Sequence, residues 1–254
     1  MIISITTISS TLKAQNKSYN KLYQFGIADA FVNGLYNAKL PLKDLKANGD
    51  FGVGAPGMLD GEITIYKGKV YQTKSTGVTA VAADSVNTAL AFVTFFKADT
   101  VFSINKTINQ LELYKLLDTY MTNKNGMYAI RVTGDFVQMK TRAFPPVSKE
   151  PYPALATIMD QMKTFELNKT KGVLIGYRIP PYLAGVNIAG YHFHYLNDAL
   201  NAGGHALNFT LTNVKVEIAN LTEFRLEVPK DKAFMNYDFK NTNKPEMDKV
   251  EKGH

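Results

Sequence analysis

The chain has 254 residues, of which 45% are hydrophobic and 20% charged, a composition typical of a soluble globular protein with one large domain or two small ones. It contains no cysteine, which excludes disulfides, thiolate metal sites and a cysteine nucleophile. The formal net charge is +7, but the lysines are scattered among acidic residues and form no aromatic-studded basic groove, so we expect no nucleic-acid partner and a mild bias towards an anionic ligand.

The N-terminus lacks the basic flank and apolar core of a signal peptide, and no apolar run approaches membrane-spanning length. We therefore expect a cytoplasmic protein with no membrane partner. Residues 6–20 are rich in Ser, Thr, Asn and Lys, which predicts a loosely held arm. Apolar spacing predicts a helix over residues 26–38, and residues 41–45 predict one further helical turn that begins at proline.

Residues 52–57 satisfy the G-x-G-x-x-G pattern, but we reject a dinucleotide site here. That site needs a strand before the glycines and a helix after them, whereas the polar residues 46–50 precede them and a β-type segment follows. We interpret the glycines as turn residues.

A hairpin is predicted next, because residues 59–66 and 69–73 alternate with period two around Lys67-Gly68. Glu62 lies on the strand face opposite Ile63 and Ile65. By pattern alone, a glutamate in that place is typical of a solvated strand residue.

Residues 90–96 are rich in Phe and Val and predict a buried strand. Residues 107–110 read as a capping box that opens a helix, which Asn125-Gly126 ends. Two short strands are predicted at residues 128–132 and 136–142, on either side of a Thr-Gly-Asp turn.

Lys140 and Arg142 share strand parity, so they could form an anion clamp, although two basic residues on a solvent face are the commoner arrangement. The prolines at positions 145, 146, 151 and 153 mark a linker. We therefore predict an N-terminal domain of residues 1–148 and a C-terminal domain of residues 149–254.

The second half is predicted to be rich in strands. A helix over residues 154–167 precedes strands at 172–179, 186–196 and 205–211, with two more between 214 and 228. By composition, residues 230–254 predict a frayed tail. Three aromatic residues in its first part, Phe234, Tyr237 and Phe239, are the expected anchors if it does fold back.

Three of the four histidines fall close together within this second half. His192 and His194 point to the same face of a strand, and the Asn- and Gly-rich turn after them can return His205 to their side. Three neutral imidazoles without a thiolate match a catalytic zinc site, which keeps coordination positions open. The alternative is three unrelated histidines in a hairpin, one paired and two exposed.

Several motifs resemble those of alpha-acetolactate decarboxylases, in consistent order and spacing from about residue 20 to the C-terminus. They are Phe51-Gly52-Val53-Gly54, Leu59-Asp60-Gly61-Glu62, Tyr128-Ala129-Ile130-Arg131, Thr141-Arg142, Gly190-Tyr191-His192-Phe193-His194 and Gly203-Gly204-His205. The resemblance implies an α/β (α+β) fold of two mixed-sheet domains with flanking helices, a metal site at their interface, and a homodimer. The sequence departs from the family pattern at Ala55, because many members carry threonine at this position of the glycine loop.

The same resemblance implies a zinc-dependent decarboxylation of (S)-2-acetolactate, a small anionic 2-hydroxy-3-keto acid, to (R)-acetoin. His192, His194 and His205 match the zinc ligands. Glu62 and Arg142 match the active-site glutamate and arginine, with Arg142 suited to bind the substrate carboxylate. A glutamate from the C-terminal tail best matches Glu251, with Glu246 as the alternative. We assign to Glu251 the role of proton donor, with Glu62 as its partner or as the holder of zinc-bound water.

Three other functions remain open on the residues alone. A zinc hydratase resembling α-carbonic anhydrase also uses three histidines, but its third ligand lies farther along the chain. A Trp usually follows its histidine pair, whereas this chain has no Trp. A cupin-type oxygenase needs a carboxylate soon after the histidine pair, for which Asp198 is a weak candidate. A metal-binding module without chemistry is the third.

Overall fold

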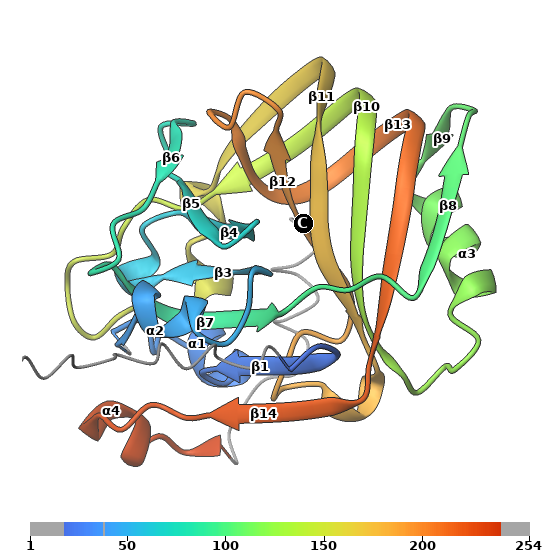
Figure 1. Ribbon diagram of the computed structural model, residues 1–254. Helices are drawn as coiled ribbons and strands as arrows, with labels where there is room; N and C mark the ends of the chain where they lie inside the picture. The colour runs from blue at the N-terminus through green and yellow to red at the C-terminus, as the bar shows by residue number, and fades with distance from the viewer. Residues whose placement is uncertain (1–17, 38, 240–254) are drawn as a thin grey trace, which may run out of the picture.

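The computed structural model describes residues 18–37 and 39–239, and it is a mixed α+β fold built mainly from two β-sheets (Figure 1). The first sheet has the order β14-β1-β7-β3-β4-β5-β6, with β2 paired to β7. Its strands are β1 Lys21–Phe25, β2 Leu40–Pro41, β3 Phe51–Pro56, β4 Glu62–Tyr66, β5 Lys69–Thr73, β6 Thr79–Val81, β7 Asn87–Thr94 and β14 Glu223–Glu227.

The second sheet has the order β10-β11-β12-β13-β8, with β9 paired to β13 and β10 also paired to β13. Its strands are β8 Thr100–Ile104, β9 Ile108–Asn109, β10 Met127–Ala143, β11 Lys163–Ile179, β12 Gly190–Asn197 and β13 Gly203–Leu221. The α-helices are α1 Ala28–Val32, α2 Leu42–Lys46, α3 Gln110–Tyr120 and α4 Lys232–Met235. Single 3₁₀ turns are η1 Gly57–Leu59, η2 Leu155–Thr157, η3 Met159–Gln161 and η4 Pro181–Leu183.

Two hydrophobic clusters cover the two faces of the second sheet. The larger lies between the sheets and combines first-sheet residues such as Phe92 with second-sheet residues such as Ile175 and Tyr177. The smaller lies on the other face, where Leu113 and Leu117 of α3 cover the long strands. Figure 1 shows this order of layers, with α3 outermost and β10, β11 and β13 between it and the first sheet.

Gly57 begins the 3₁₀ turn η1, as the interpretation as turn residues expects, but Gly52 and Gly54 are strand residues, so their prediction as turn residues was wrong. They lie in β3, and every residue of this strand is buried. A Cβ atom at Gly52 would lie 2.1 Å from the carbonyl oxygen of Phe92, and one at Gly54 would lie 2.4 Å from that of Leu90. Glycine is therefore required here by the close approach of β7 rather than by a turn.

The prediction of a turn at residues 133–135 was also wrong, because β10 runs through these residues as one strand. Gly134 has φ +148°, and the pairing of β10 with β13 shifts register between Gly134 and Asp135. The turn-type residues at positions 133–135 thus mark a β-bulge. In the same way, the strands predicted over 205–211 and from 214 onward join as β13, with Asn213 at φ +49° inside it.

A helix over residues 154–167 does not form. The segment makes η2 and η3 and then enters β11, which pairs with β10 from Lys163 opposite Ala143 to Arg178 opposite Tyr128. This long pairing outweighs the local helical pattern, as tertiary context commonly does.

Other predicted elements are confirmed with changed limits. The β4–β5 hairpin has the expected turn, with positive φ at Lys67 and Gly68. The helix expected over residues 26–38 is only the five residues of α1. The capping box of α3 lies at Asn109 and Glu112, two residues later than predicted, and the helix ends at Tyr120.

The boundary predicted between residues 148 and 149 does not coincide with a division between the sheets. Strands β8, β9 and β10 precede it yet belong to the second sheet, and β14 follows it yet pairs in parallel with β1. The two-domain division therefore stays a prediction. In the part of the chain that the structure describes, no helix has both the length and the apolar character needed to cross a membrane.

Candidate metal centre

The three predicted ligand histidines meet at one end of the second sheet, on its face towards the first sheet. His192 and His194 come from β12, and His205 of β13 is the direct strand partner of His194. The turn between them is stabilised by the Asn197 side chain, which accepts hydrogen bonds from the backbone N–H groups of Asn201 and Ala202. The same-face parity of the pair and the return of His205 are confirmed, and all three side chains are buried.

The spacing of the imidazole nitrogens fits a small cation. Nε2 of His192 lies 3.3 Å from Nε2 of His194 and 3.3 Å from Nδ1 of His205, and one nitrogen of each ring falls within 4.8 Å of the other two. A tetrahedral zinc ion about 2.0–2.1 Å from each nitrogen would set its ligands about 3.3 Å apart. Neutral imidazole lone pairs that converge at this distance need a shared proton or a cation between them. The donor set therefore fits a metal.

His194 is held in the neutral form and in the tautomer that a ligand requires. Its Nδ1 donates to the carbonyl oxygen of Ile63 at 2.9 Å, which leaves the Nε2 lone pair directed towards the other histidines. Burial holds the pKa of His194 well below 6.5, and the charges of His192 and Arg142 lower it further. The carbonyl that orients this ring belongs to β4 of the first sheet.

Glu62 and Arg142 form a buried ion pair beside the histidines, with Arg142 Nη1 2.6 Å from Glu62 Oε1. Glu62 is 6% exposed and Arg142 4%, so the interpretation of Glu62 as a solvated strand residue is wrong. The other carboxylate oxygen, Oε2, lies 3.5 Å from Nε2 of His194. Arg142 is the strand partner of His205, which places the guanidinium next to the ligand set.

The structure does not bring Lys140 into this site. Its side chain is 41% exposed, and its Nζ lies 4.0 Å from Oε1 of Glu166. The guanidinium of Arg142 instead stacks over the ring of Phe144, at 5.2 Å from its centroid. Among the described residues, no group accepts a hydrogen bond from the buried Nε of Arg142.

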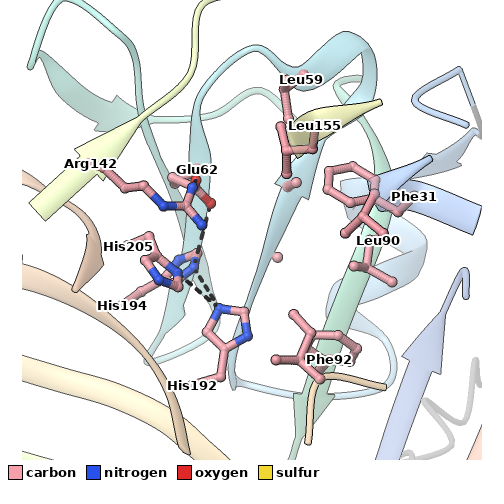
Figure 2. Close-up of a pocket in the computed structure, with 14 residues that line it drawn as sticks. Phe31, Leu59, Glu62, Leu90, Phe92, Arg142, Leu155, His192, His194 and His205 are labelled. Atoms are coloured by element: carbon pink, nitrogen blue, oxygen red, sulfur yellow. Dashed lines mark hydrogen bonds and ion pairs between the residues drawn. The ribbon is translucent and has the colours of Figure 1, made fainter. Parts of the chain in front are cut away.

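A pocket opens between this polar group and an apolar wall (Figure 2). The sequence patterns did not identify the wall, because the apolar residues come from separate segments and carry no chemical signature. The lining includes Phe31, Val32, Gly54, Ala55, Leu59, Leu90, Phe92, Leu155 and Ile188. In Figure 2 the labelled apolar side chains face the histidines, Glu62 and Arg142 across the pocket. The site therefore offers charge and convergent imidazoles on one side and apolar contact on the other.

The tail carboxylates Glu246 and Glu251 lie outside the described residues. Up to residue 239 the tail is structured rather than frayed, because α4 is capped by Asp231, whose side chain accepts from the backbone N–H of Phe234. The ring of Phe239 packs against those of Phe234 and Tyr237, with centroids 5.7 and 4.7 Å apart.

Comparison with known proteins gives one consistent result. Residues 22–241 match the family model described as alpha-acetolactate decarboxylase. The chain is 35% identical to an alpha-acetolactate decarboxylase of Methanosarcina mazei, across 93% of this chain and 82% of that protein. It is 33% identical to one of Brevibacillus brevis, across 91% of this chain and 81% of that protein. The crystal structure of the Bacillus subtilis alpha-acetolactate decarboxylase superposes with a TM-score of 0.88 at 25% identity, over 92% of this chain and all of that one.

Proposed function

The chain belongs to the alpha-acetolactate decarboxylase family, and from this premise we propose that it converts (S)-2-acetolactate to (R)-acetoin and CO2, with zinc held by His192, His194 and His205. One observation carries the proposal: the buried Glu62–Arg142 pair lies directly beside three convergent imidazoles in a pocket with an apolar opposite wall.

The reaction sets the requirements that this site must meet. The bond between C2 and the carboxylate carbon breaks, CO2 leaves, and the electron pair moves through C2 and C3 to the ketone oxygen, giving an enediolate. A proton then adds to one face of one enediolate carbon and fixes the configuration of acetoin. The protein must bind a carboxylate, stabilise the charge of the enediolate and deliver one proton from one side.

Arg142 is suited to bind the carboxylate. Its Nη1 is engaged by Glu62, while its Nε is buried without an acceptor among the described residues, so part of the planar fork is left for a ligand. An arginine fork recognises a carboxylate through parallel hydrogen bonds and can fix the direction of the bond to be broken. Stacking on Phe144 and the bond to Glu62 hold this fork in place before substrate arrives.

Glu62 holds the guanidinium with one oxygen and faces His194 with the other, so its carboxylate lies between the carboxylate-binding group and the metal ligands. We assign to it the orientation of Arg142 and a share in proton handling. We assign the delivery of the proton to Glu251 of the tail, on the family resemblance. Two carboxyl groups brought close together have different pKa values, which allows one of them to stay protonated.

Zinc fits the ligand set, because neutral imidazoles at the observed spacing are ordinary zinc donors. When bound, it would supply a Lewis-acidic centre that stabilises the negative charge developing on the substrate oxygens. The chain's own contribution is to keep His194 neutral by burial, to fix its tautomer through the Ile63 carbonyl, and to exclude water with Leu90 and Phe92.

The decisive experiment supplies racemic 2-acetolactate to the purified protein and follows CO2, acetoin and the enantiomeric composition of the acetoin. We expect both products, with (R)-acetoin in excess, and zinc near one ion per chain by elemental analysis. Release of neither product by the zinc-loaded protein would favour a zinc hydratase or a metal-binding module instead. The homodimer and the cytoplasmic location stay predictions, of which light scattering tests the first.

A further inference from the structure

The two walls of the pocket come largely from different sheets, so its width depends on how the sheets are joined. The histidines belong to β12 and β13, whereas Leu90 and Phe92 belong to β7. A polar tie between the sheets that lies close to the pocket would therefore fix the space open to a substrate.

Tyr177 of β11 supplies such a tie. It is 1% exposed, and its hydroxyl lies 3.1 Å from the carbonyl oxygen of Phe51 and 3.3 Å from that of Phe92. These acceptors are on β3 and β7, two neighbouring strands of the first sheet. The hydroxyl has one proton, so a single donor is shared by both carbonyl groups. Burial raises the pKa of Tyr177 well above 10, and the hydroxyl therefore remains a donor at all working pH values.

Tyr177 is connected to both walls of the pocket. It is the direct strand partner of His192, so its backbone is joined to the metal-ligand wall. Its hydroxyl holds the carbonyl of Phe92, whose ring lines the apolar wall and meets the His192 ring edge-on, at 6.1 Å between centroids. The Phe51 and Phe92 rings also meet the Tyr177 ring edge-on, at 6.0 and 6.5 Å.

We propose that Tyr177 is a positioning residue that sets the distance between His192 and Phe92, and with it the preference of the enzyme for the size of the alkyl groups on its substrate. The proposal rests on the proposed function, because alkyl size is meaningful only for a 2-hydroxy-3-keto acid bound in this pocket. Tyr177 does not line the pocket itself. Its effect must therefore be transmitted through the position of Phe92.

The test is Tyr177→Phe, which removes the hydroxyl and keeps the ring. We would measure kcat/KM for 2-acetolactate and for its homologue with an ethyl group at C2 in place of methyl. A fitted pocket can discriminate one methylene by about 10- to 200-fold, so partial loss of the fit should lower the preference for the smaller substrate about 3- to 10-fold. Zinc content should stay at the wild-type value, because no ligand is changed.

Tyr195→Phe is the matched control. It deletes another buried hydroxyl from the same sheet, one that bonds to Thr170 at 2.9 Å in the cluster beneath α3. Both variants should lose some thermal stability, and only Tyr177→Phe should change the substrate ratio. A double-mutant cycle with Phe92→Leu adds a second readout. If Tyr177 acts through Phe92, its hydroxyl should have little further effect on the ratio once Phe92 is shortened.

The outcomes are distinguishable. Wild-type protein inactive on both substrates would contradict the proposed function. Wild-type activity with an unchanged ratio in Tyr177→Phe, or with an equal change in Tyr195→Phe, would overturn the role of Tyr177 alone. Full additivity with Phe92→Leu would show that Tyr177 does not act through that wall.

Discussion

Arg142→Lys is the substitution that separates charge from geometry at this site. Lysine keeps the positive charge beside Glu62, so the buried carboxylate is not left alone, a change that would otherwise cost about 3–5 kcal/mol. The fold and the zinc should therefore be retained. What lysine cannot supply is a planar fork that bonds Glu62 at 2.6 Å with one nitrogen while others remain for the substrate carboxylate.

The expected loss follows from the hydrogen bonds at stake. Each bond to a charged group contributes about 1.5–3 kcal/mol, and loss of one or two bonds to the substrate, partly offset by the retained charge, amounts to roughly 3 kcal/mol. Since 1.36 kcal/mol is tenfold in rate, we expect kcat/KM for acetolactate to fall about 10²-fold. Steady-state acetoin formation measures this directly.

Arg131→Lys is the matched control. Arg131 lies on the same strand and bonds both oxygens of Glu217, at 2.7 and 2.9 Å, and neither residue lines the pocket. The same change there should lower stability slightly and leave kcat/KM unchanged. An unaltered kcat/KM in Arg142→Lys, or an equal fall in Arg131→Lys, would refute the assignment of Arg142 to the substrate carboxylate.

Three further predictions test the metal, the tail and the pH dependence. His194→Ala should purify with far less than one zinc per chain by elemental analysis, while His254→Ala, which changes the one histidine that is not a proposed ligand, should keep full zinc. Deletion of residues 250–254 should slow turnover about 10²-fold and lower the optical purity of acetoin. Deletion of residues 252–254, which spares Glu251, should change neither. If the longer deletion keeps the wild-type turnover rate and the wild-type optical purity of acetoin, Glu251 is not the proton donor. The hydrogen bonds from Arg131 and Lys215 hold the pKa of Glu217 below 4.5, so its stabilisation is present above that value and is lost as pH falls through the lower folded pKa. Urea unfolding should therefore show that Glu217→Gln is less stable than wild type by about 1–3 kcal/mol at pH 7, and this difference should shrink below pH 4.5. A difference in unfolding free energy that does not change with pH would contradict its origin in the ion pair.

The convergence of the three histidines could be predicted from sequence because its signal is local. Strand parity alone places His192 and His194 on one face, and the turn residues Asn197 to Ala202 are enough to return His205. The pairing of Glu62 with Arg142 joins positions 80 residues apart, and no periodicity connects them. By pattern each reads as a solvated strand residue, and only resemblance to a family pointed to the pair.

The errors share a physical cause, since they fall where long-range strand pairing overrides local chemistry. Gly134 and Asn213 have the backbone conformations of turn residues, yet both lie within long strands that continue past them. The segment after Pro153 has a helical pattern, but its far end is drawn into β11 by 15 paired positions of β10. A β-bulge and a turn use the same residues, and only the partner strand decides between them.

The division of the site between two sheets has a consequence for metal binding. All three ligands lie on the second sheet, but the carbonyl that fixes His194 and the carboxylate that faces it come from adjacent residues of β4, Ile63 and Glu62. A ligand is held more tightly when a neighbouring group fixes its tautomer. Docking of the first sheet would therefore strengthen the binding of a metal by these histidines, and by linkage a bound metal would stabilise the docked arrangement by the same free energy. The docked β4 strand thus contributes to the pocket through Glu62 and to the orientation of His194 through Ile63, so the same sheet contact serves the pocket and the histidine cluster.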